Sequence, residues 1–366
     1  MTRYLSTLIK PASSLCNMRC KYCFYADVSE NRMIPSYGIM SAETSEQLIG
    51  RFFEGITPPG EITFAFQGGE PTLAGLAYFE HFTAYAEKVN AGRFSLHYAI
   101  QTNGLILNED WCRFFKKYHF LVGVSLDGDE SLHDFCRPDA GRQGTFARIR
   151  KNIRLLERYG VDYNILSVIT KQMAKHPAAQ FRFYERNQFQ FVQLIPCLKP
   201  LGEEKAGPFD LTPRLYAGFL KQFFSLWYEA LVQGRYISVR QFDNIARMMA
   251  GFPPEQCGML GFCSPQFVIE ADGGVYPCDF YVLDKYRGGN IKTDSLESIS
   301  ASEPFQRFLK EQEPLPPLCS TCPVRRLCGG GCRRYRSFYA EEAGYCPQQD
   351  FLLATGSRFS EVARRI

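Results

Sequence analysis

The sequence predicts an α/β protein, a partial (β/α)6 TIM-like barrel followed by a smaller cysteine-rich domain. Short β-rich runs alternate with helical patterns six times between Leu5 and about Gln233. Six such units in series imply a parallel sheet with helices outside it, and its chemistry would lie at the carboxyl ends of the strands. Conspicuous motifs follow these strands, and eight cysteines follow residue 256. We therefore expect domains at residues 1–234 and 235–366.

The predicted strands and helices alternate along the chain. The candidate strands are Leu5–Ile9, Glu61–Gln67, Ser95–Thr102, Leu121–Leu126, Asp162–Ile169 and Phe189–Leu194. The candidate helices are Glu43–Phe53, Ala74–Val89, Glu109–Lys117, Thr145–Tyr159, Pro177–Asn187 and Thr212–Gln233. Apolar residues at spacings of three and four indicate these helices, and Ser41 and Thr212 are typical helix starts. A polar loop, Lys199–Asp210, precedes the last helix, and a short strand, Tyr236–Val239, follows it.

Composition excludes several classes of protein. Hydrophobic content of 45% and charged content of 22% are ordinary for a globular domain. A net charge of +4 does not provide the basic stripe of a nucleic-acid-binding protein. We expect neither a signal peptide nor a membrane span, and no nucleic-acid or membrane partner. The cysteines cluster towards the two ends, which favours metal ligation over disulfides and a cytoplasmic, anaerobic setting. Cys112, Cys136 and Cys197 are expected to be reduced structural thiols.

The first cysteine motif predicts a reactive iron–sulfur cluster. Cys16, Cys20 and Cys23 have the spacing C-x3-C-x2-C, and Tyr22 precedes the third cysteine. Three thiolates can hold three irons of a 4Fe–4S cluster, which leaves the fourth iron open to a ligand. A zinc knuckle or scattered buried cysteines are the alternatives. Zinc would need a nearby fourth ligand, and the first candidate after the motif is Asp27.

Polar and glycine-rich motifs end three of the predicted strands. They are Gln67–Thr72 (sequence QGGEPT), Gln101–Gly104 and Ser125–Gly128. Glycine allows the backbone to approach a ligand closely, and the Glu70 carboxylate could bind an ammonium group. A turn before a helix is the alternative interpretation of the glycine motif. Its place after a strand, downstream of the cysteines, favours a ligand site.

The second cysteine cluster predicts further metal sites. Its eight members are Cys257, Cys263, Cys278, Cys319, Cys322, Cys328, Cys332 and Cys346. Eight thiolates can fully ligate two 4Fe–4S clusters, although a pair of zinc sites would also need eight. A fully ligated cluster favours electron transfer over direct substrate binding. Spacing alone does not divide the eight cysteines into two sets.

The C-x3-C-x-aromatic-C motif resembles the signature of the radical S-adenosylmethionine (SAM) enzymes. The resemblance implies a SAM-binding cluster on the first three cysteines. It also implies SAM contacts from Tyr22, Gly68, Gly69, Glu70, Ser125, Arg137 and Leu198. Glu70 would lie in the segment that holds the SAM amino group, and Ser125 and Arg137 would meet its carboxylate. A salt-bridged surface position for Arg137 and plain core packing for Leu198 are the alternatives.

The second cysteine pattern resembles the SPASM domain, a C-terminal extension that carries auxiliary clusters. By this resemblance auxiliary cluster I is held by Cys257, Cys263, Cys278 and Cys332. Auxiliary cluster II is held by Cys319, Cys322, Cys328 and Cys346. Nearby arginines could balance the cluster charge or dock an acidic electron carrier, and a solvated basic face is the alternative. These arginines are Arg325, Arg326, Arg333, Arg334 and Arg336.

Further stretches are similar to the anaerobic sulfatase-maturating enzymes: Leu8–Ser14, Ser36–Met40, Phe64–Thr72 and Tyr276–Lys285. This family oxidises a sulfatase Cys or Ser, in a Cys/Ser-x-Pro-x-Arg segment, to Cα-formylglycine. The resemblance implies that a 5′-deoxyadenosyl radical removes a Cβ hydrogen and that Asp279 is the base. Asp279 could instead orient the cluster loop. Tyr25 and Gln67 are expected to contact the peptide or to support Asp279, and Lys199–Asp210 to shape the peptide groove.

Two rival functions stay open at this point. A radical SAM maturase that cross-links ribosomal peptides would share the fold and cofactors, but Cys16 leaves little room for a preceding leader-binding domain. A non-catalytic metal or electron-transfer protein would not cleave SAM. The partners expected for the favoured function are a sulfatase polypeptide and an electron donor such as ferredoxin or flavodoxin, and we expect a monomer.

Overall fold

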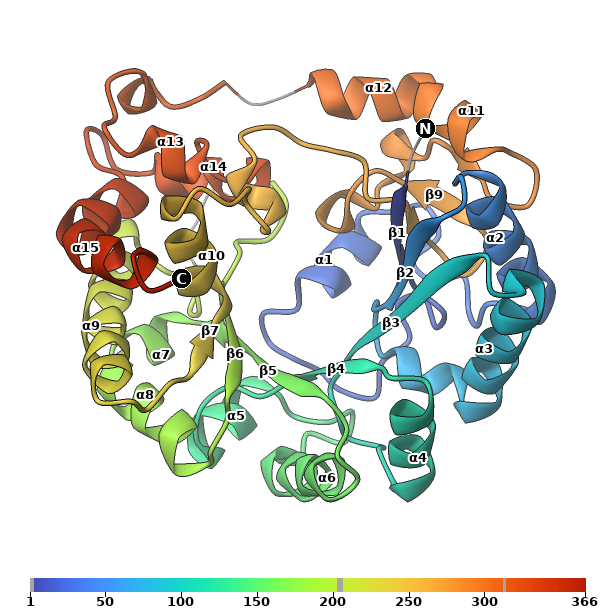
Figure 1. Ribbon diagram of the computed structural model, residues 1–366, viewed down its shortest axis with the longest axis horizontal. Helices are drawn as coiled ribbons and strands as arrows, with labels where there is room; N and C mark the ends of the chain where they lie inside the picture. The colour runs from blue at the N-terminus through green and yellow to red at the C-terminus, as the bar shows by residue number, and fades with distance from the viewer. Residues whose placement is uncertain (1–2, 203–206, 312–313) are drawn as a thin grey trace. The chain divides into compact units, whose positions relative to one another are not determined.

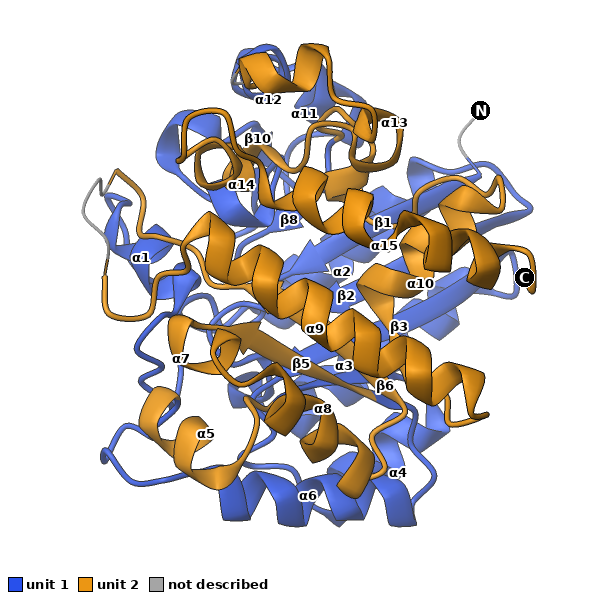
Figure 2. Cartoon of the chain, turned by 90° about the vertical axis from the view of Figure 1, so that its left-hand side faces the viewer, with its two compact units in different colours: residues 1–125, 137–163, 265–311 blue, residues 126–136, 164–264, 312–366 orange. Residues whose placement is uncertain are grey.

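The computed structural model describes residues 3–202, 207–311 and 314–366. The chain divides into two compact units, each assembled from separate stretches of sequence (Figure 2). Unit 1 consists of residues 1–125, 137–163 and 265–311. Unit 2 consists of residues 126–136, 164–264 and 312–366. The predicted loop Lys199–Asp210 includes residues 203–206, which lie outside the described residues.

Unit 1 contains a sheet whose strands alternate along the chain with helices (Figure 1). Its first elements are β1 (Tyr4–Ile9), α1 (Phe24–Glu30), α2 (Ala42–Glu54), β2 (Gly60–Phe66), η1 (Pro71–Ala74), α3 (Leu76–Asn90), β3 (Phe94–Thr102), α4 (Glu109–Lys117), β4 (Leu121–Ser125) and α6 (Phe146–Arg158). Its later elements are β8 (Val268–Ile269), β9 (Gly274–Tyr276), η3 (Asp279–Tyr281), η4 (Asp284–Tyr286), β10 (Gly289–Asn290), α11 (Leu296–Ala301) and α12 (Glu303–Lys310).

The strands of unit 1 follow the order β10-β9-β8-β1-β2-β3-β4. The pairs β1–β2, β2–β3 and β3–β4 are parallel, which agrees with the predicted series of βα units. Leu8 and Ile9 of β1 also pair in parallel with Val268 and Ile269 of β8. Strands β8 and β9 pair in the antiparallel sense and form a hairpin. The late hairpin β8–β9 therefore lies directly beside the first strand.

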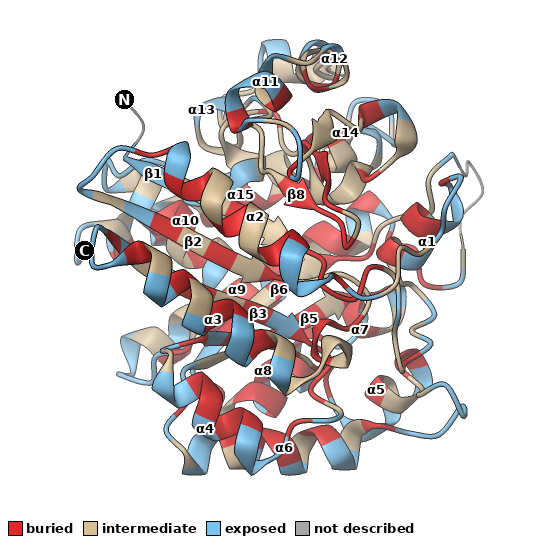
Figure 3. Cartoon of the chain, turned by 90° about the vertical axis from the view of Figure 1, so that its right-hand side faces the viewer, coloured by how far each residue is buried: buried red, intermediate tan, exposed pale blue. Residues whose placement is uncertain are grey.

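Aromatic side chains fill the core of unit 1. Phe66 contacts Phe79 at 4.9 Å and Phe82 at 5.1 Å between ring centres, in edge-to-face geometry. Such pairs contribute roughly 0.5–1.5 kcal/mol beyond the burial of their area. Helices α3 and α4 each have one buried and one exposed side (Figure 3). The packed core keeps the carboxyl ends of the strands, where the predicted motifs lie, in fixed positions.

Unit 2 is built mainly from helices around three short parallel strands. Its elements are α5 (Glu130–Cys136), β5 (Tyr163–Ile169), α7 (Lys171–Ala174), α8 (Pro177–Arg186), β6 (Phe191–Pro196), α9 (Pro213–Val232), β7 (Ser238–Val239), α10 (Arg240–Met249), η2 (Cys257–Met259), η5 (Pro317–Ser320), α13 (Arg325–Cys328), α14 (Arg333–Tyr339) and α15 (Pro347–Ala363). The first residue of β5, Tyr163, is assigned to unit 1. Phe224 of α9 and Phe359 of α15 pack at 4.3 Å between ring centres.

Local sequence signals account for several helix starts. Ser41 caps α2 by accepting a hydrogen bond from the Thr44 N–H at 3.1 Å, and Thr212 caps α9 with Pro213 in its first turn. Both starts confirm the predictions. Neither α1 nor the β8–β9 hairpin was predicted. Within the described ranges, no helix is both long and apolar enough to cross a membrane.

Candidate active site

The loop between β1 and α1 contains the three cysteines of the first motif. Cys23 is the N-cap of α1, and its sulfur accepts a hydrogen bond from the Ala26 N–H at 3.4 Å. The sulfur of Cys16 accepts one from the Met18 N–H, also at 3.4 Å. Burial raises the pKa of the Cys16 thiol to about 11, so metal binding there must displace its proton. All three cysteines are half-buried.

The glycine-rich motif after β2 fastens this loop. The N–H of Gly69 donates to the Ser13 carbonyl oxygen at 2.8 Å, and the N–H of Glu70 donates to that of Leu15 at 2.7 Å. A Cβ on Gly69 would lie 2.2 Å from the Leu15 oxygen, and one on Gly68, at φ +138°, would lie 2.9 Å from the Ser13 oxygen. Glycine is therefore required for a close approach of two backbone segments. The two predicted SAM-contacting glycines also position the cysteine loop.

The Glu70 carboxylate connects the ends of β2 and β3. Its Oε1 accepts hydrogen bonds from the N–H and hydroxyl of Thr72 and, at 2.7 Å, from the Thr102 hydroxyl. Its Oε2 accepts one from the Asn103 N–H at 2.7 Å. Burial raises the pKa of Glu70, and these hydrogen bonds only partly offset that effect. Among the described residues Oε2 receives this single bond, so it has capacity left for a ligand ammonium.

Two polar side chains lie beside the cysteine sulfurs. Arg137 Nη1 lies 3.8 Å from the Cys20 sulfur, and its guanidinium lies 5.2 Å from the centre of the Tyr22 ring. Asn103 Nδ2 lies 4.0 Å from the Cys16 sulfur. Arg137 is 8% exposed, so the alternative of a surface position for it is wrong. Asn103 was not singled out as a site residue, although it lies in a motif that the sequence places at a strand end.

The other predicted contacts lie on both units. Ser125 is the last residue of β4 in unit 1 and is half-buried. Gln67 directly follows β2, and its N–H donates to the Ile9 carbonyl oxygen at 2.9 Å. Leu198 lies in unit 2, two residues after β6, and is half-buried. The structure thus brings Ser125 and Gln67 to strand ends of the unit that contains the cysteine loop.

Asp279 lies in a charged, largely buried setting. It begins η3 directly after Cys278. Lys10 Nζ lies 2.5 Å from Asp279 Oδ1 and 3.8 Å from the centre of the Tyr25 ring. The Lys10 side chain is fully buried, whereas that of Asp279 is 13% exposed. The carboxylate therefore balances a buried ammonium charge while part of it remains accessible.

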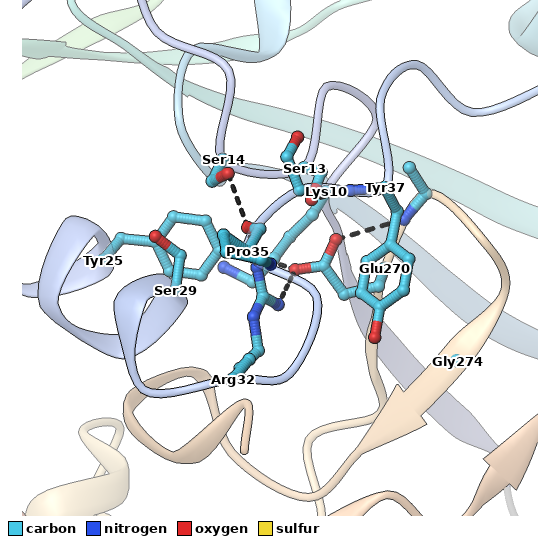
Figure 4. A network of polar contacts seen from close by, with 12 residues as sticks. Lys10, Ser13, Ser14, Tyr25, Ser29, Arg32, Pro35, Tyr37, Glu270 and Gly274 are labelled. Carbon is cyan, nitrogen blue, oxygen red and sulfur yellow. Dashed lines mark hydrogen bonds and ion pairs between the residues drawn. The ribbon is translucent and has the colours of Figure 1, made fainter. Parts of the chain in front are cut away.

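Sequence reasoning missed three charged residues next to Asp279 and Tyr25: Lys10, Arg32 and Glu270. Arg32 and Glu270 form an ion pair, and the Tyr25 hydroxyl donates to Glu270 (Figure 4). The position of Lys10 and Glu270 in the sequence is a signal that could have indicated these two residues. Lys10 and Glu270 each directly follow the last apolar residue of a strand, where charge is rarely buried without a partner.

Four cysteines of the second cluster converge within unit 2. Cys319, Cys328 and Cys346 line a cavity of about 370 Å³. Burial raises the pKa of the Cys328 thiol, and repulsion from the thiols of Cys319, Cys322 and Cys346 raises it further. Four thiols close enough to interact in this way fit the ligand set of one 4Fe–4S cluster.

A separate group of three cysteines lies in unit 2. Burial, together with the nearby thiols of Cys257 and Cys263, raises the pKa of Cys332 to about 11. Cys278 belongs to unit 1. In the described part of the chain, no three His, Cys, Asp or Glu side chains are spaced to hold a single metal ion. Proximity therefore divides the seven C-terminal cysteines that lie in unit 2 into a group of four and a group of three.

Comparison with known families agrees with this arrangement. Residues 11–176 match the radical SAM superfamily, and residues 262–323 match the SPASM family, an iron–sulfur cluster-binding domain. The fold and the site thus define a radical SAM protein with a C-terminal SPASM domain. The predicted fold class and the choice of iron–sulfur clusters over zinc are confirmed.

Individual relatives narrow the family further. The chain is 44% identical over 331 residues to the cysteine-type anaerobic sulfatase-maturating enzyme of Clostridium novyi (strain NT), covering 90% of this chain and 88% of the relative. It is 29% identical over 348 residues to the serine-type enzyme of Bacteroides thetaiotaomicron, covering 91% and 83%. The solved structure of native anSMEcpe with bound AdoMet and Kp18Cys peptide matches with a TM-score of 0.92 and 38% identity, over 99% of this chain and all of that one. The chain therefore belongs to the anaerobic sulfatase-maturating enzymes.

Proposed function

We propose that the chain oxidises the cysteine of a sulfatase Cys-x-Pro-x-Arg segment to Cα-formylglycine, with the corresponding serine segment as a poorer substrate. The Lys10–Asp279 pair carries this proposal, because it presents a partly accessible carboxylate directly after a candidate cluster ligand. The preference for cysteine rests on 44% identity to a cysteine-type relative against 29% identity to a serine-type one.

The cofactor site would be formed by the strand ends of unit 1. Cys16, Cys20 and Cys23 would hold a 4Fe–4S cluster with one open iron, and SAM would bind there. When bound, SAM and this cluster supply the 5′-deoxyadenosyl radical that takes a hydrogen atom from the target Cβ. The remaining acceptor capacity of Glu70 Oε2 and the buried Arg137 support this assignment. The proposed SAM contacts are Tyr22, Gly68, Gly69, Glu70, Ser125, Arg137 and Leu198.

Asp279 would remove the proton of the target thiol. The substrate loses one hydrogen atom, one proton and one electron, which converts its Cβ–SH group to a thioaldehyde. Water then replaces the sulfur, and H₂S leaves the aldehyde. A general base must lie within hydrogen-bond distance of its proton, so Asp279 needs an accessible oxygen while Lys10 occupies the other. Tyr25 and Gln67 would border the peptide beside it.

The cysteines of the second cluster would conduct the electron that the substrate releases. We assign Cys319, Cys322, Cys328 and Cys346 to auxiliary cluster II, supported by the shared cavity of Cys319, Cys328 and Cys346 and by the electrostatic effect of Cys322 on Cys328. We assign Cys257, Cys263, Cys278 and Cys332 to auxiliary cluster I, supported by the proximity of its three unit 2 members. A ferredoxin or flavodoxin would exchange electrons with a monomeric enzyme. A boundary near residue 234 is supported by the two family matches, which lie on either side of it.

An anaerobic turnover assay tests this function. The reconstituted enzyme is given SAM, a reductant and a peptide with either Cys-x-Pro-x-Arg or Ser-x-Pro-x-Arg, and mass spectrometry and carbonyl trapping detect the product. We expect an aldehyde at the target position, formed faster from the cysteine peptide. Asp279→Asn should lower aldehyde formation by about 10²–10⁴-fold while 5′-deoxyadenosine is still released. Release of 5′-deoxyadenosine by the unaltered enzyme with both peptides intact would rule out the sulfatase substrate.

A further inference from the structure

Arg32 and Glu270 form a buried ion pair that the proposed reaction does not use. Arg32 Nη1 lies 2.5 Å from Glu270 Oε1, and both side chains are excluded from solvent. Arg32 Nη2 also donates to the Pro35 carbonyl oxygen at 2.7 Å. Removing two charges from water is unfavourable, and apolar side chains of similar volume often stabilise a protein as well or better. A role in fixing local geometry is therefore a better account of the pair than a contribution to stability.

Three contacts connect this ion pair to Asp279. The Tyr25 hydroxyl donates to Glu270 Oε1, the oxygen that also binds Arg32 (Figure 4). The Tyr25 ring in turn lies 3.8 Å from Lys10 Nζ, a cation–π distance. Lys10 Nζ donates a hydrogen bond to Asp279 Oδ1. Two cations and two carboxylates thus alternate around one tyrosine.

The same contacts join segments that are far apart in the sequence. Tyr25 lies in α1, the helix that Cys23 caps. Lys10 follows β1, and its N–H donates to the Ile269 carbonyl oxygen at 2.8 Å, where β1 pairs with β8. Glu270 directly follows β8. A displacement of Glu270 would therefore reach the Tyr25 side chain and, through its ring, the lysine that holds the proposed base.

We propose that the Arg32–Glu270 ion pair positions the proposed base. Glu270 holds the Tyr25 hydroxyl, and the Tyr25 ring supports the Lys10 ammonium. Lys10 then occupies Asp279 Oδ1 and turns Oδ2 towards the substrate. Among the described residues no donor hydrogen-bonds to Oδ2, which agrees with this orientation. Arg32 and Glu270 are positioning residues here, and their role rests on the proposed function of Asp279.

A displaced base would separate two events that normally occur together. Cleavage of SAM and removal of the Cβ hydrogen do not require Asp279, whereas removal of the thiol proton does. Loss of the ion pair should therefore raise the ratio of 5′-deoxyadenosine released to formylglycine formed. The KM for the peptide should change less than kcat, because neither Arg32 nor Glu270 is placed in contact with the peptide and only Tyr25 connects them to it.

The first test is Glu270→Gln in the cluster-loaded enzyme. Glutamine keeps the shape and an acceptor oxygen but removes the charge opposite Arg32. We expect kcat for formylglycine to fall about tenfold with KM within about twofold, since small misplacements of reacting groups reduce rates by up to about 10²-fold. Both products are quantified by liquid chromatography and mass spectrometry. The urea midpoint of the iron-free protein is measured in parallel, because breaking the pair should also destabilise the fold.

A second variant separates positioning from stability. Arg32→Met together with Glu270→Leu replaces the ion pair by apolar packing, which should restore the urea midpoint but leaves the Tyr25 hydroxyl without its acceptor. We expect this double variant to retain the raised product ratio. The matched control is Asp272→Asn, at a residue of the same hairpin, which breaks the 2.8 Å pair between Asp272 and Arg287. It should leave the product ratio unchanged.

The outcomes distinguish the inference from the proposed function. A raised ratio in Glu270→Gln and in the double variant, but not in Asp272→Asn, supports the inference. If the double variant restores both stability and the normal ratio, the pair is only structural and the inference is wrong. It is also wrong if the two products fall in proportion in Glu270→Gln. Failure of the proposed function would look different, because every protein, including the control, would then release 5′-deoxyadenosine without forming formylglycine.

Discussion

The two cysteine-bearing regions of the chain are supported in different ways. The loop with Cys16, Cys20 and Cys23 lies between β1, which is paired on both sides, and α1, and backbone hydrogen bonds from residues 69–70 fasten it. The segment from Pro317 to Cys328 contains two helices of four residues each, η5 and α13. Glycines 329, 330 and 331 follow at φ values of +60°, +85° and +75°. The first region is held by the fold, whereas the second has little regular structure of its own.

This difference indicates how each region uses its metal. A reactive site needs its groups fixed before the substrate arrives, and the sheet of unit 1 supplies that rigidity. The four thiols assigned to auxiliary cluster II would instead gain their order from that cluster, because metal-binding free energy would then become folding free energy. We therefore expect changes in the first region to affect chemistry and changes in the second region to affect folding.

The largest effect is expected from Cys20→Ala. It removes one of three ligands from the proposed SAM cluster, so formylglycine formation should fall at least about 1000-fold. Iron content should fall from about twelve to about eight atoms per chain, since each cluster contributes four. Iron assay and mass spectrometry measure both quantities. Cys112→Ala, at a buried cysteine of α4, is the control and should retain all the iron. An unchanged iron content in Cys20→Ala would exclude it as a ligand.

The next largest effect is expected from iron removal, which should make the second region more sensitive to proteolysis than the first. After chelation under reducing conditions, limited proteolysis should cut within residues 314–346 at least about tenfold faster than within residues 3–125. The reason is that the second region loses the clusters that order it, whereas backbone pairing still holds the first. Peptide mapping by mass spectrometry follows both rates. Equal rates would mean that both regions are equally ordered without iron.

Gly69→Ala should test how firmly the fold holds the first region. The added Cβ would lie 2.2 Å from the Leu15 carbonyl oxygen, so the cysteine loop must shift. We expect a loss of about 2–4 kcal/mol in the free energy of unfolding of the iron-free protein, measured in urea. Gly50→Ala, in α2 with no heavy atom within 4 Å of its added Cβ, should instead stabilise by about 0.5–1 kcal/mol. Similar values for the two variants would contradict the close approach.

The smallest effect is expected from Asp350→Asn at the start of α15. Burial tends to raise the pKa of Asp350, but hydrogen bonds from Lys221 and Tyr345 lower it overall. A lowered folded-state pKa stabilises the protein above the unfolded pKa, about 3.9, and this contribution disappears as pH falls through the folded value. The pair is partly exposed and screened, so we expect a loss of roughly 0.5–1 kcal/mol at pH 7. The difference between variant and parent in urea unfolding should shrink as pH falls below the unfolded pKa, and a difference that stays constant with pH would exclude this ion-pair origin.

The sequence predicted the barrel elements because their signals are local. The helix Glu109–Lys117 has the predicted bounds, and the six predicted strands lie within a few residues of those observed. Helix α1 was missed because seven residues after a cysteine loop show little periodicity. Strand β8 has two residues, and its pairing with β1 is set by tertiary contacts that no window of the sequence contains.

The residues of the candidate site likewise fall into those that the sequence predicts and those that it does not. The cysteine spacings and the Gly68–Glu70 motif are short patterns, so the chain itself displays them. Lys10, Arg32 and Glu270 become recognisable only through their partners, and the Arg32–Glu270 pair joins residues 238 apart in the sequence. Charge that follows an apolar strand is a weak signal until the partner is known. Long-range pairing of buried charges is therefore the part that sequence reasoning could not supply.

The pairing of β1 with β8 has a consequence for synthesis of the enzyme. Lys10 and Asp279 are 269 residues apart, so the first strand waits for its neighbour while most of the chain is made. At about 5–20 residues per second this delay is roughly 13–54 s. A nascent fragment can therefore contain all three N-terminal cysteines and Lys10 before Asp279, the proposed base, has been made. Iron loaded onto such a fragment would meet an incomplete site, so the order of translation favours loading the metal after Asp279 has been made.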